Sequence, residues 1–149
     1  QMEFLDETIS KVEGRVADLL MAIEPLIVTV PGVSTATGAQ IVAEIGDVRR
    51  FRNASAIVKY AGLDSGVSQS GQFEAKGEPI TKQGSPYLRR SIWLAANQCR
   101  RFDPTMKAYY DKLRAQGKCH RVAVTACARK LCHIIYAIMR DQVAYGANR

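Results

Sequence analysis

Apolar residues recur at every third or fourth position along the start of the chain. This seam consists of Met2, Leu5, Ile9, Val12, Val16, Leu19 and Ile23. Spacings that alternate between three and four place these side chains along one side of a helix, which is the heptad pattern of a coiled coil. A single amphipathic helix packed on its own domain would give the same pattern. We expect residues 1–25 to form a short coiled-coil dimerisation helix.

The rest of the chain, residues 26–146, predicts one compact and mostly helical domain. Ser85-Pro86 and Asp103-Pro104 each pair a capping side chain with a proline that suits the first turn of a helix. Helices are expected at Ala54–Ala61 after a cap at Asn53, at 85–101, at 103–117, and from about His120 to Val143. The last of them carries an apolar stripe of Val124, Cys127, Leu131, Ile134 and Ile138.

An apolar stretch that ends in Pro31-Gly32-Val33 precedes a helix that Ser34 or Thr35 caps and Gly46 ends. This order indicates a helix-hairpin-helix over about residues 28–46, in which backbone amides at the start of the second helix bind a DNA phosphate. Such binding tolerates any base sequence. Gly32, Ser34 and Thr35 are the candidate contacts. The usual hairpin has a second glycine where Ser34 stands, and a plain helical turn explains the pattern equally well.

Residues 62–85 have the composition of a loop, with five glycines and one proline in 24 residues. A loop of that length inside a compact domain is uncommon and is often functional. A short β-hairpin around Gln72–Ile80 would fill part of it. Its serines Ser65, Ser68 and Ser70 are candidate nucleophiles, although a serine before a glycine in a loop is most often a turn residue.

Charge is distributed unevenly along the chain. The first 30 residues hold six acids and two bases, a net charge of −4. Because the formal charge of the whole chain is +7, the other 119 residues carry +11. An excess of that size attracts polyanions, of which nucleic acid is the common one, although a solvated basic surface without a partner has the same composition. The cations nearest to the hairpin and the loop are the candidate contacts: Arg49, Arg50, Arg52, Lys76, Lys82, Arg89 and Arg90.

The four cysteines, Cys99, Cys119, Cys127 and Cys132, form no CxxC pair. We expect them to be reduced core thiols rather than a metal site, and we expect no cofactor in this chain. No run approaches the roughly 18 apolar residues of a membrane span, and the acidic N-terminus does not resemble a signal peptide. These features predict a cytoplasmic protein without a membrane partner.

Five blocks of sequence resemble a known family in their order along the chain. They are VPGV and IVAEIGDVRRF within 30–51, KYAGLD at 59–64, QSGQF at 69–73, ITKQGSPYLRR at 80–90 and VAVTACARKL at 122–131. Together they resemble the C-terminal domain of the bacterial transposases of the insertion-sequence 110/116/902 family, relatives of the Piv-type DNA invertases. The coil that precedes them is similar to the linker of that family.

The resemblance implies a chemistry for Ser70. In the family, a serine before a glycine attacks DNA and becomes covalently attached to it, and Ser70 matches that position whereas Ser65 and Ser68 do not. Many relatives have two serines there, but this chain has Gln69 before Ser70. The resemblance also implies a RuvC-like N-terminal domain that binds divalent metal, namely magnesium, through four acids, and a bridge RNA that pairs with the DNA.

Nothing before residue 30 resembles the RuvC-like domain. We therefore expect a catalytic-serine domain that binds nucleic acid but does not recombine DNA alone. A helix-hairpin-helix DNA-binding module without chemistry is the alternative, and a coiled-coil assembly domain with an incidental basic surface is a weaker one. A module that only binds DNA needs no glycine-rich loop followed by Lys82, Arg89 and Arg90. The presence of that loop therefore favours the enzyme.

Overall fold

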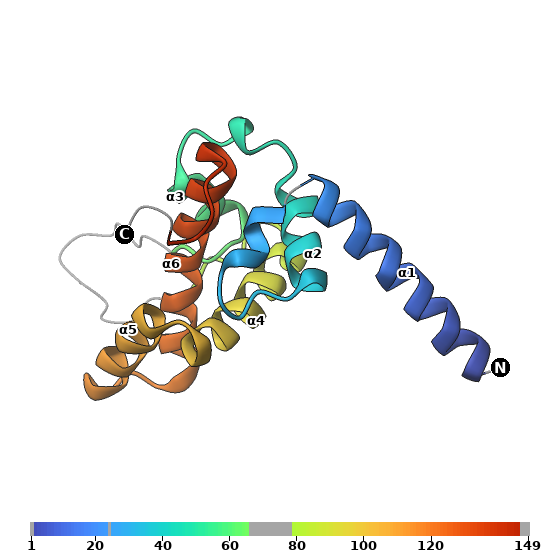
Figure 1. The fold of residues 1–149 in the computed structure, drawn as a ribbon. Helices are drawn as coiled ribbons and strands as arrows, with labels where there is room; N and C mark the ends of the chain where they lie inside the picture. Colours follow the sequence, from blue (N-terminus) through green and yellow to red (C-terminus); the bar gives the residue numbers. More distant parts are fainter. Residues whose placement is uncertain (1, 24, 66–78, 147–149) are drawn as a thin grey trace.

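The structure is a computed structural model that describes residues 2–23, 25–65 and 79–146 (Figure 1). Its elements are α1 (Met2–Ile23), the 3-10 helix η1 (Pro25–Thr29), α2 (Thr35–Ile45), the 3-10 helix η2 (Val48–Arg50), α3 (Ala54–Tyr60), α4 (Pro86–Phe102), α5 (Pro104–Ala115) and α6 (His120–Asp141). Within these ranges the only β-type pairing is an isolated antiparallel bridge between Ser65 and Ile80. The prediction of a mostly helical chain is confirmed.

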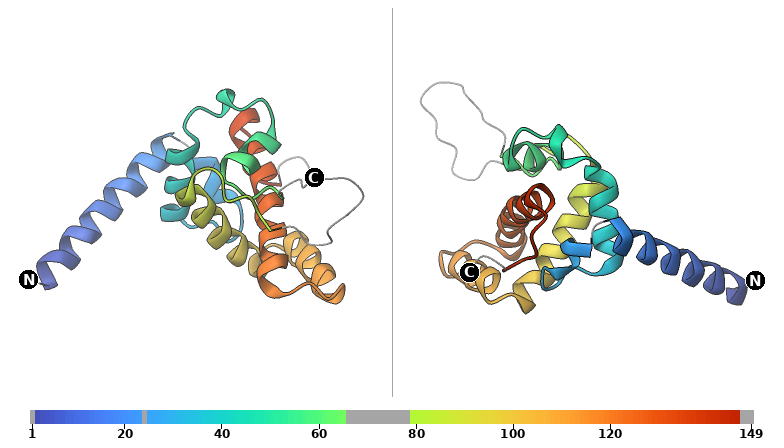
Figure 2. Two further views of the ribbon diagram at one scale, coloured as in Figure 1. Left: turned by 180° about the vertical axis from the view of Figure 1, so that it is seen from behind. Right: turned by 45° about the horizontal axis from the view of Figure 1, so that its top comes forward.

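Helix α1 stands away from the body of the protein, as all three ribbon views show (Figures 1 and 2). It contacts α2 and η1. The seam residues Met2, Leu5, Ile9 and Val12 are each more than half exposed, at 80%, 56%, 55% and 55%. The predicted helix is therefore present, and the part of its apolar seam from Met2 to Val12 is uncovered. Its pairing with a second helix stays a prediction.

Helix α6 forms the centre of the domain and packs against α3, α4 and α5. Its buried side chains are Ala123, Val124, Cys127, Ala128, Leu131, Cys132, Ile135, Ile138 and Met139. Removing such a face from water is the main favourable contribution to folding. Among the described helices, α6 alone has the length and apolar composition of a membrane span. That is weak evidence, because half of the stretch is buried against the protein itself.

The predicted starts of α3, α4 and α5 are correct, and each depends on a local hydrogen bond. The Leu88 amide donates to Ser85 Oγ at 3.1 Å and the Met106 amide donates to Asp103 Oδ2 at 2.9 Å. Asn53 likewise caps α3. Each bond satisfies one of the amides that the first turn of a helix leaves without a partner. The end of α6 also has a local cause. The helix stops at Asp141, two residues before the expected Val143, because Gln142 has a left-handed backbone conformation.

The hairpin region differs in detail from the expectation. Its first element is the five-residue 3-10 helix η1, and of the two candidate caps it is Ser34 that accepts from the Thr37 amide, at 3.2 Å. Gly32 has a φ of 98°, and a Cβ there would lie 2.6 Å from the Cys99 amide nitrogen. This glycine lets the hairpin pack directly on the backbone of α4. The helix-hairpin-helix itself stays a prediction.

Gly84 lies where the chain returns from the glycine-rich loop to the body. The Ser85 amide donates to the Tyr60 carbonyl at 2.8 Å, which ties the start of α4 to the end of α3. A Cβ on Gly84 would lie 2.1 Å from that same carbonyl oxygen, and the φ of Gly84 is 127°. Only glycine fits this contact.

We predict that Gly84→Ala destabilises the chain by about 2–4 kcal/mol, because the strained backbone and the steric clash act together. Gly117→Ala is the matched control, since Gly117 also has a positive φ of 81° but open space at its Cβ. The control should cost only about 1 kcal/mol. Urea unfolding measures both changes, and equal losses would show that the contact with Tyr60 has no special importance.

Candidate nucleic-acid interface

Both ends of the predicted serine loop are fastened at one place, which we call the neck (residues 62–65 and 79–82). The Thr81 amide donates to the Asp64 carbonyl at 2.9 Å, and the Lys82 amide donates to the Gly62 carbonyl at 3.1 Å. Thr81 Oγ1 also donates to Asp64 Oδ1 at 2.5 Å. The two strands of the neck therefore lie side by side.

Several predicted site residues belong to the stretch of sequence that joins the two segments of the neck. Ser68, Ser70 and Lys76 lie outside the residues that the structure describes, as does most of the expected hairpin at 72–80. Their assignments stay predictions. The described residues on either side, Ser65 and Pro79, place both ends of the segment 66–78 at the neck.

Two arginines attach the neck to the helices. Arg129 of α6 donates Nε to the Leu63 carbonyl at 2.5 Å, and Arg89 of α4 donates Nη1 to the Ala61 carbonyl at 3.1 Å. The Arg89 guanidinium also lies against Gly62, because a Cβ there would come within 2.7 Å of Nη1. Arg89 was predicted to contact nucleic acid, and the structure gives it a contact with the protein backbone. The sequence prediction missed Arg129.

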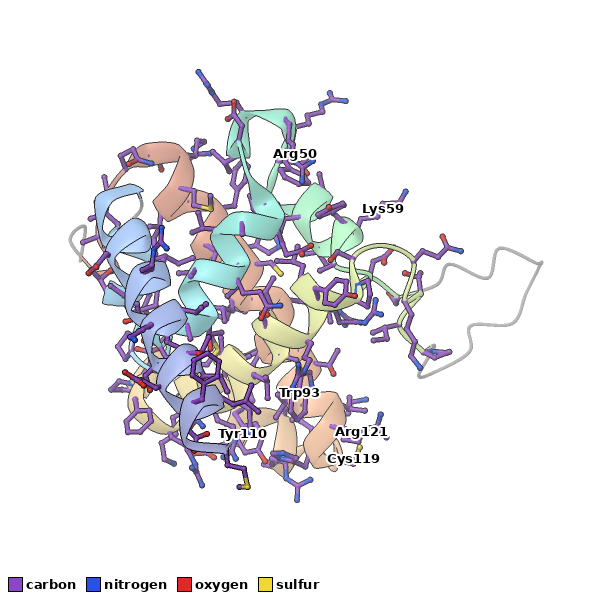
Figure 3. The ribbon with its side chains drawn as sticks, turned by 90° about the vertical axis from the view of Figure 1, so that its right-hand side faces the viewer. Arg50, Lys59, Trp93, Tyr110, Cys119 and Arg121 are labelled. Atoms are coloured by element: carbon purple, nitrogen blue, oxygen red, sulfur yellow. The ribbon has the colours of Figure 1, made fainter. Side chains whose placement is uncertain are left out.

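A groove of about 760 Å³ lies beside the neck, and we call it the basic groove. It is lined by Ser65, Pro79, Ile80, Lys82, Leu113, Lys118, Cys119, Arg121, Val122, Thr125, Ala126 and Arg129. Among the residues that the structure describes, this lining holds four cations and no acid. Lys82, Lys118 and Arg121 form no side-chain hydrogen bond or ion pair with any other described residue. Figure 3 shows Cys119 and Arg121 together at the start of α6.

The start of α6 increases the positive potential of this groove. Cys119 occupies the N-cap position without making a capping hydrogen bond, whereas side chains cap α2, α3, α4 and α5. Amides at an uncapped helix start carry partial positive charge and suit an anion. Arg121 lies in that first turn, where the helix dipole disfavours a cation. The basic groove therefore concentrates positive charge that no acidic side chain in its described lining neutralises.

The other predicted cations lie elsewhere. Arg50 donates to the Ile45 and Glu44 carbonyls at 2.8 and 3.0 Å and stacks over Phe51 and Tyr60, so it satisfies the end of α2.

Arg49 pairs with Asp47 at 2.9 Å, and that hydrogen bond raises the pKa of Arg49 and lowers the pKa of Asp47. Both side chains are exposed, so the pair stabilises the fold little. Arg52 on the η2–α3 turn and Arg90 on α4 are exposed. None of these cations lines the basic groove.

The predicted contacts at the start of α2 lie in a separate place. Gly32 and Ser34 line a second groove, of about 740 Å³, against α4 residues that include Asn97 and Gln98. Thr35 faces a third groove beside α1. Neither lining includes a lysine or an arginine. The structure therefore separates the hairpin from the basic groove.

The cysteines and acids of the described residues give no metal site. No group of three His, Cys, Asp or Glu side chains converges in this part of the chain. Cys99, Cys127 and Cys132 are buried as expected, and burial raises their thiol pKa values to about 12, 11 and 12. Cys119 differs from the expectation because it is exposed, in the basic groove.

Comparisons with known proteins give a consistent result. Residues 24–111, more than half of the chain, match the family described as Transposase IS116/IS110/IS902. An uncharacterized 43.6 kDa protein of insertion element IS110 from Streptomyces coelicolor is 33% identical over 91% of this chain and 34% of its own length. The pilin gene-inverting protein of Moraxella bovis is 30% identical over 78% of this chain and 36% of its own length. The chain thus spans about a third of these relatives.

We predict that one cysteine of the folded chain reacts with a maleimide at about pH 8, and that all four react in denaturant. The thiolate is the reactive form, and a buried thiol with a raised pKa stays protonated at that pH. Mass spectrometry of the labelled peptides should locate the adduct on Cys119, and Cys119→Ser should abolish it. Labelling of Cys99 or Cys132 in the folded chain would contradict the described packing.

Proposed function

The chain belongs to the IS116/IS110/IS902 transposase family, and from this membership we propose that it supplies the serine nucleophile of a DNA recombinase. The observation that carries the proposal is the neck. It fastens both ends of the segment that contains Ser70 beside a groove whose described lining has four cations and no acid. A nucleophile for DNA must be held close to a phosphate whose negative charge the protein compensates.

The proposed reaction is a transesterification. Ser70 Oγ attacks a phosphorus of the DNA strand, an Oγ–P bond forms, and one P–O bond to deoxyribose breaks. The serine proton ends on the oxygen of the leaving strand, so a phosphodiester is exchanged for a phosphoserine ester without net loss of bond energy. Attack by another strand end reverses the step and joins new partners. Lys82, Lys118, Arg121 and Arg129 would stabilise the charge that develops on the phosphate.

The complete reaction needs more than this chain. The relatives are about three times as long, and the described residues hold no group that fits a metal ion. We propose that a RuvC-like domain elsewhere in the complete protein binds magnesium, and that a bridge RNA selects the DNA sites. No step above is derived through that metal.

Other surfaces would hold the nucleic acid around the site. Ser34 caps α2 through the Thr37 amide alone, so the other amides at this helix start, beside Gly32, Ser34 and Thr35, would bind a single phosphate as in a helix-hairpin-helix. Arg52 and Arg90 are exposed and available for phosphate contacts. The apolar seam of α1 would pair with that of a second copy.

We predict that Ser70→Ala in the complete recombinase leaves nucleic-acid binding unchanged but abolishes the covalent adduct. Denaturing gels of reactions on labelled DNA would detect the adduct, and peptide mapping would locate it. Ser68→Ala is the matched control, because it removes a hydroxyl from the same segment and should keep full activity. Recombination by Ser70→Ala at the normal rate, or an adduct on Ser65 or Ser68, would refute the assignment.

We predict a dimer that forms through α1. Introducing glutamate at Leu5 and Val12 places charge on the exposed seam and should yield a monomer in sedimentation at about tens of micromolar, a range suited to a coil of so few heptads. The variant Thr8→Glu with Ser10→Glu adds the same charge off the seam and should stay dimeric. A monomeric parent chain at that concentration would exclude the dimer.

A further inference from the structure

We propose that the basic groove binds an unpaired nucleotide of the DNA strand that lies beside the neck. The base would lie on the apolar floor of the groove and the flanking phosphates on its cationic rim. This inference rests on the proposed function, because it names the form of DNA that the site accepts. It concerns residues of the neck, α5 and α6 that the sequence resemblance does not assign to any role.

The floor of the groove is apolar and open to solvent. Pro79 and Ile80 of the neck line it together with Leu113, Val122 and Ala126. Val122 is 51% exposed, although the two residues that follow it, Ala123 and Val124, are fully buried in the core. Contacts to duplex DNA go mostly to phosphates and need no such floor. The flat face of an unstacked base is an apolar surface that would cover it.

The rim of the groove is cationic on several sides. Lys82 comes from the neck, Lys118 and Arg121 flank the start of α6, and Arg129 lies two turns further along that helix. A positively charged groove that follows a strand, combined with an apolar surface for the bases, is the usual design of a site for single strands. The cations alone would suit duplex DNA equally well. The apolar floor is the feature that favours an unpaired nucleotide over a duplex.

The size of the groove agrees with this occupant. Its volume of about 760 Å³ falls within the range of roughly 300–1,000 Å³ that small-molecule sites span. A nucleotide is a ligand of that kind, whereas a duplex presents a broad and rigid surface. The second groove of similar size, between α2 and α4, has no cation in its lining and fits a nucleic-acid strand less well.

Binding of short oligonucleotides to the complete 149-residue chain tests the proposal. Fluorescence anisotropy would compare a thymidine decamer with an abasic decamer of the same charge and with a blunt duplex. We expect the thymidine decamer to bind about fivefold more tightly than the abasic one, because covering the floor buries apolar area. A decamer of uridine provides the RNA comparison. The thymidine decamer should also protect Cys119, which lines the groove, from maleimide.

Two variants separate the floor from the rim. Val122→Ser should remove the preference for the thymidine decamer over the abasic one and should leave the fold intact, because Val122 is half exposed. Arg121→Ala should weaken both decamers and reduce the slope of log K against log salt by about 0.7, the value for one phosphate of a single strand. Arg15→Ala on α1 removes the same charge away from the groove and should change neither quantity.

Equal binding of the thymidine and abasic decamers would overturn the proposal, as would unprotected Cys119 at saturation. Binding of the uridine decamer with protection of Cys119, when the thymidine decamer gives none, would overturn the assignment to DNA. These assays measure binding by the described groove residues and require no adduct on a serine. A failed search for the serine adduct in the complete recombinase would therefore refute the proposed function and leave the groove measurement standing.

Discussion

Burial of one face of α6 is the constraint on which the rest of the structure depends. Helices α3, α4 and α5 all pack against it, and three of the four cysteines are buried in the core, one on α4 and two on α6. The rotation of α6 about its axis is fixed by this packing, because protein interiors are close-packed. The same rotation directs Arg129 to the Leu63 carbonyl and presents Arg121 and Val122 to the basic groove. The core thus sets the geometry of the neck.

Where a structural feature depends on neighbouring residues, the sequence predicted it correctly. The caps at Asn53, Ser85 and Asp103 are hydrogen bonds over three residues, so their chemistry can be read along the chain. The neck and the groove depend on contacts over long separations, such as the one between Arg129 and Leu63, which are 66 residues apart. No local pattern marks such a pair, and an arginine in an apolar helix has the same appearance whether it binds a carbonyl or a phosphate.

The predicted arginines illustrate this limit. Arg50 and Arg89 were candidate contacts because they are basic residues close to the hairpin and the loop. In the structure, each donates to a backbone carbonyl at the end of a helix, where the helix dipole favours a cation. Arg121 was not a candidate contact. It lies at the start of a helix, where the helix dipole disfavours a cation, and no described residue compensates its charge. The local environment therefore distinguishes Arg50 and Arg89, which complete the ends of helices, from Arg121, whose charge no described side chain compensates.

This distinction bears on how the proposed reaction would be promoted. Asp64, the acid of the neck, accepts a hydrogen bond from Thr81 and holds the two strands of the neck together. The groove lining supplies cations, an uncapped helix start and an apolar floor, and it supplies neither carboxylate nor imidazole. In the proposed reaction, the contribution of the described residues would thus be positional and electrostatic. A phosphate held there would meet charges already in place, which avoids the cost of reorganising them as the transition state forms.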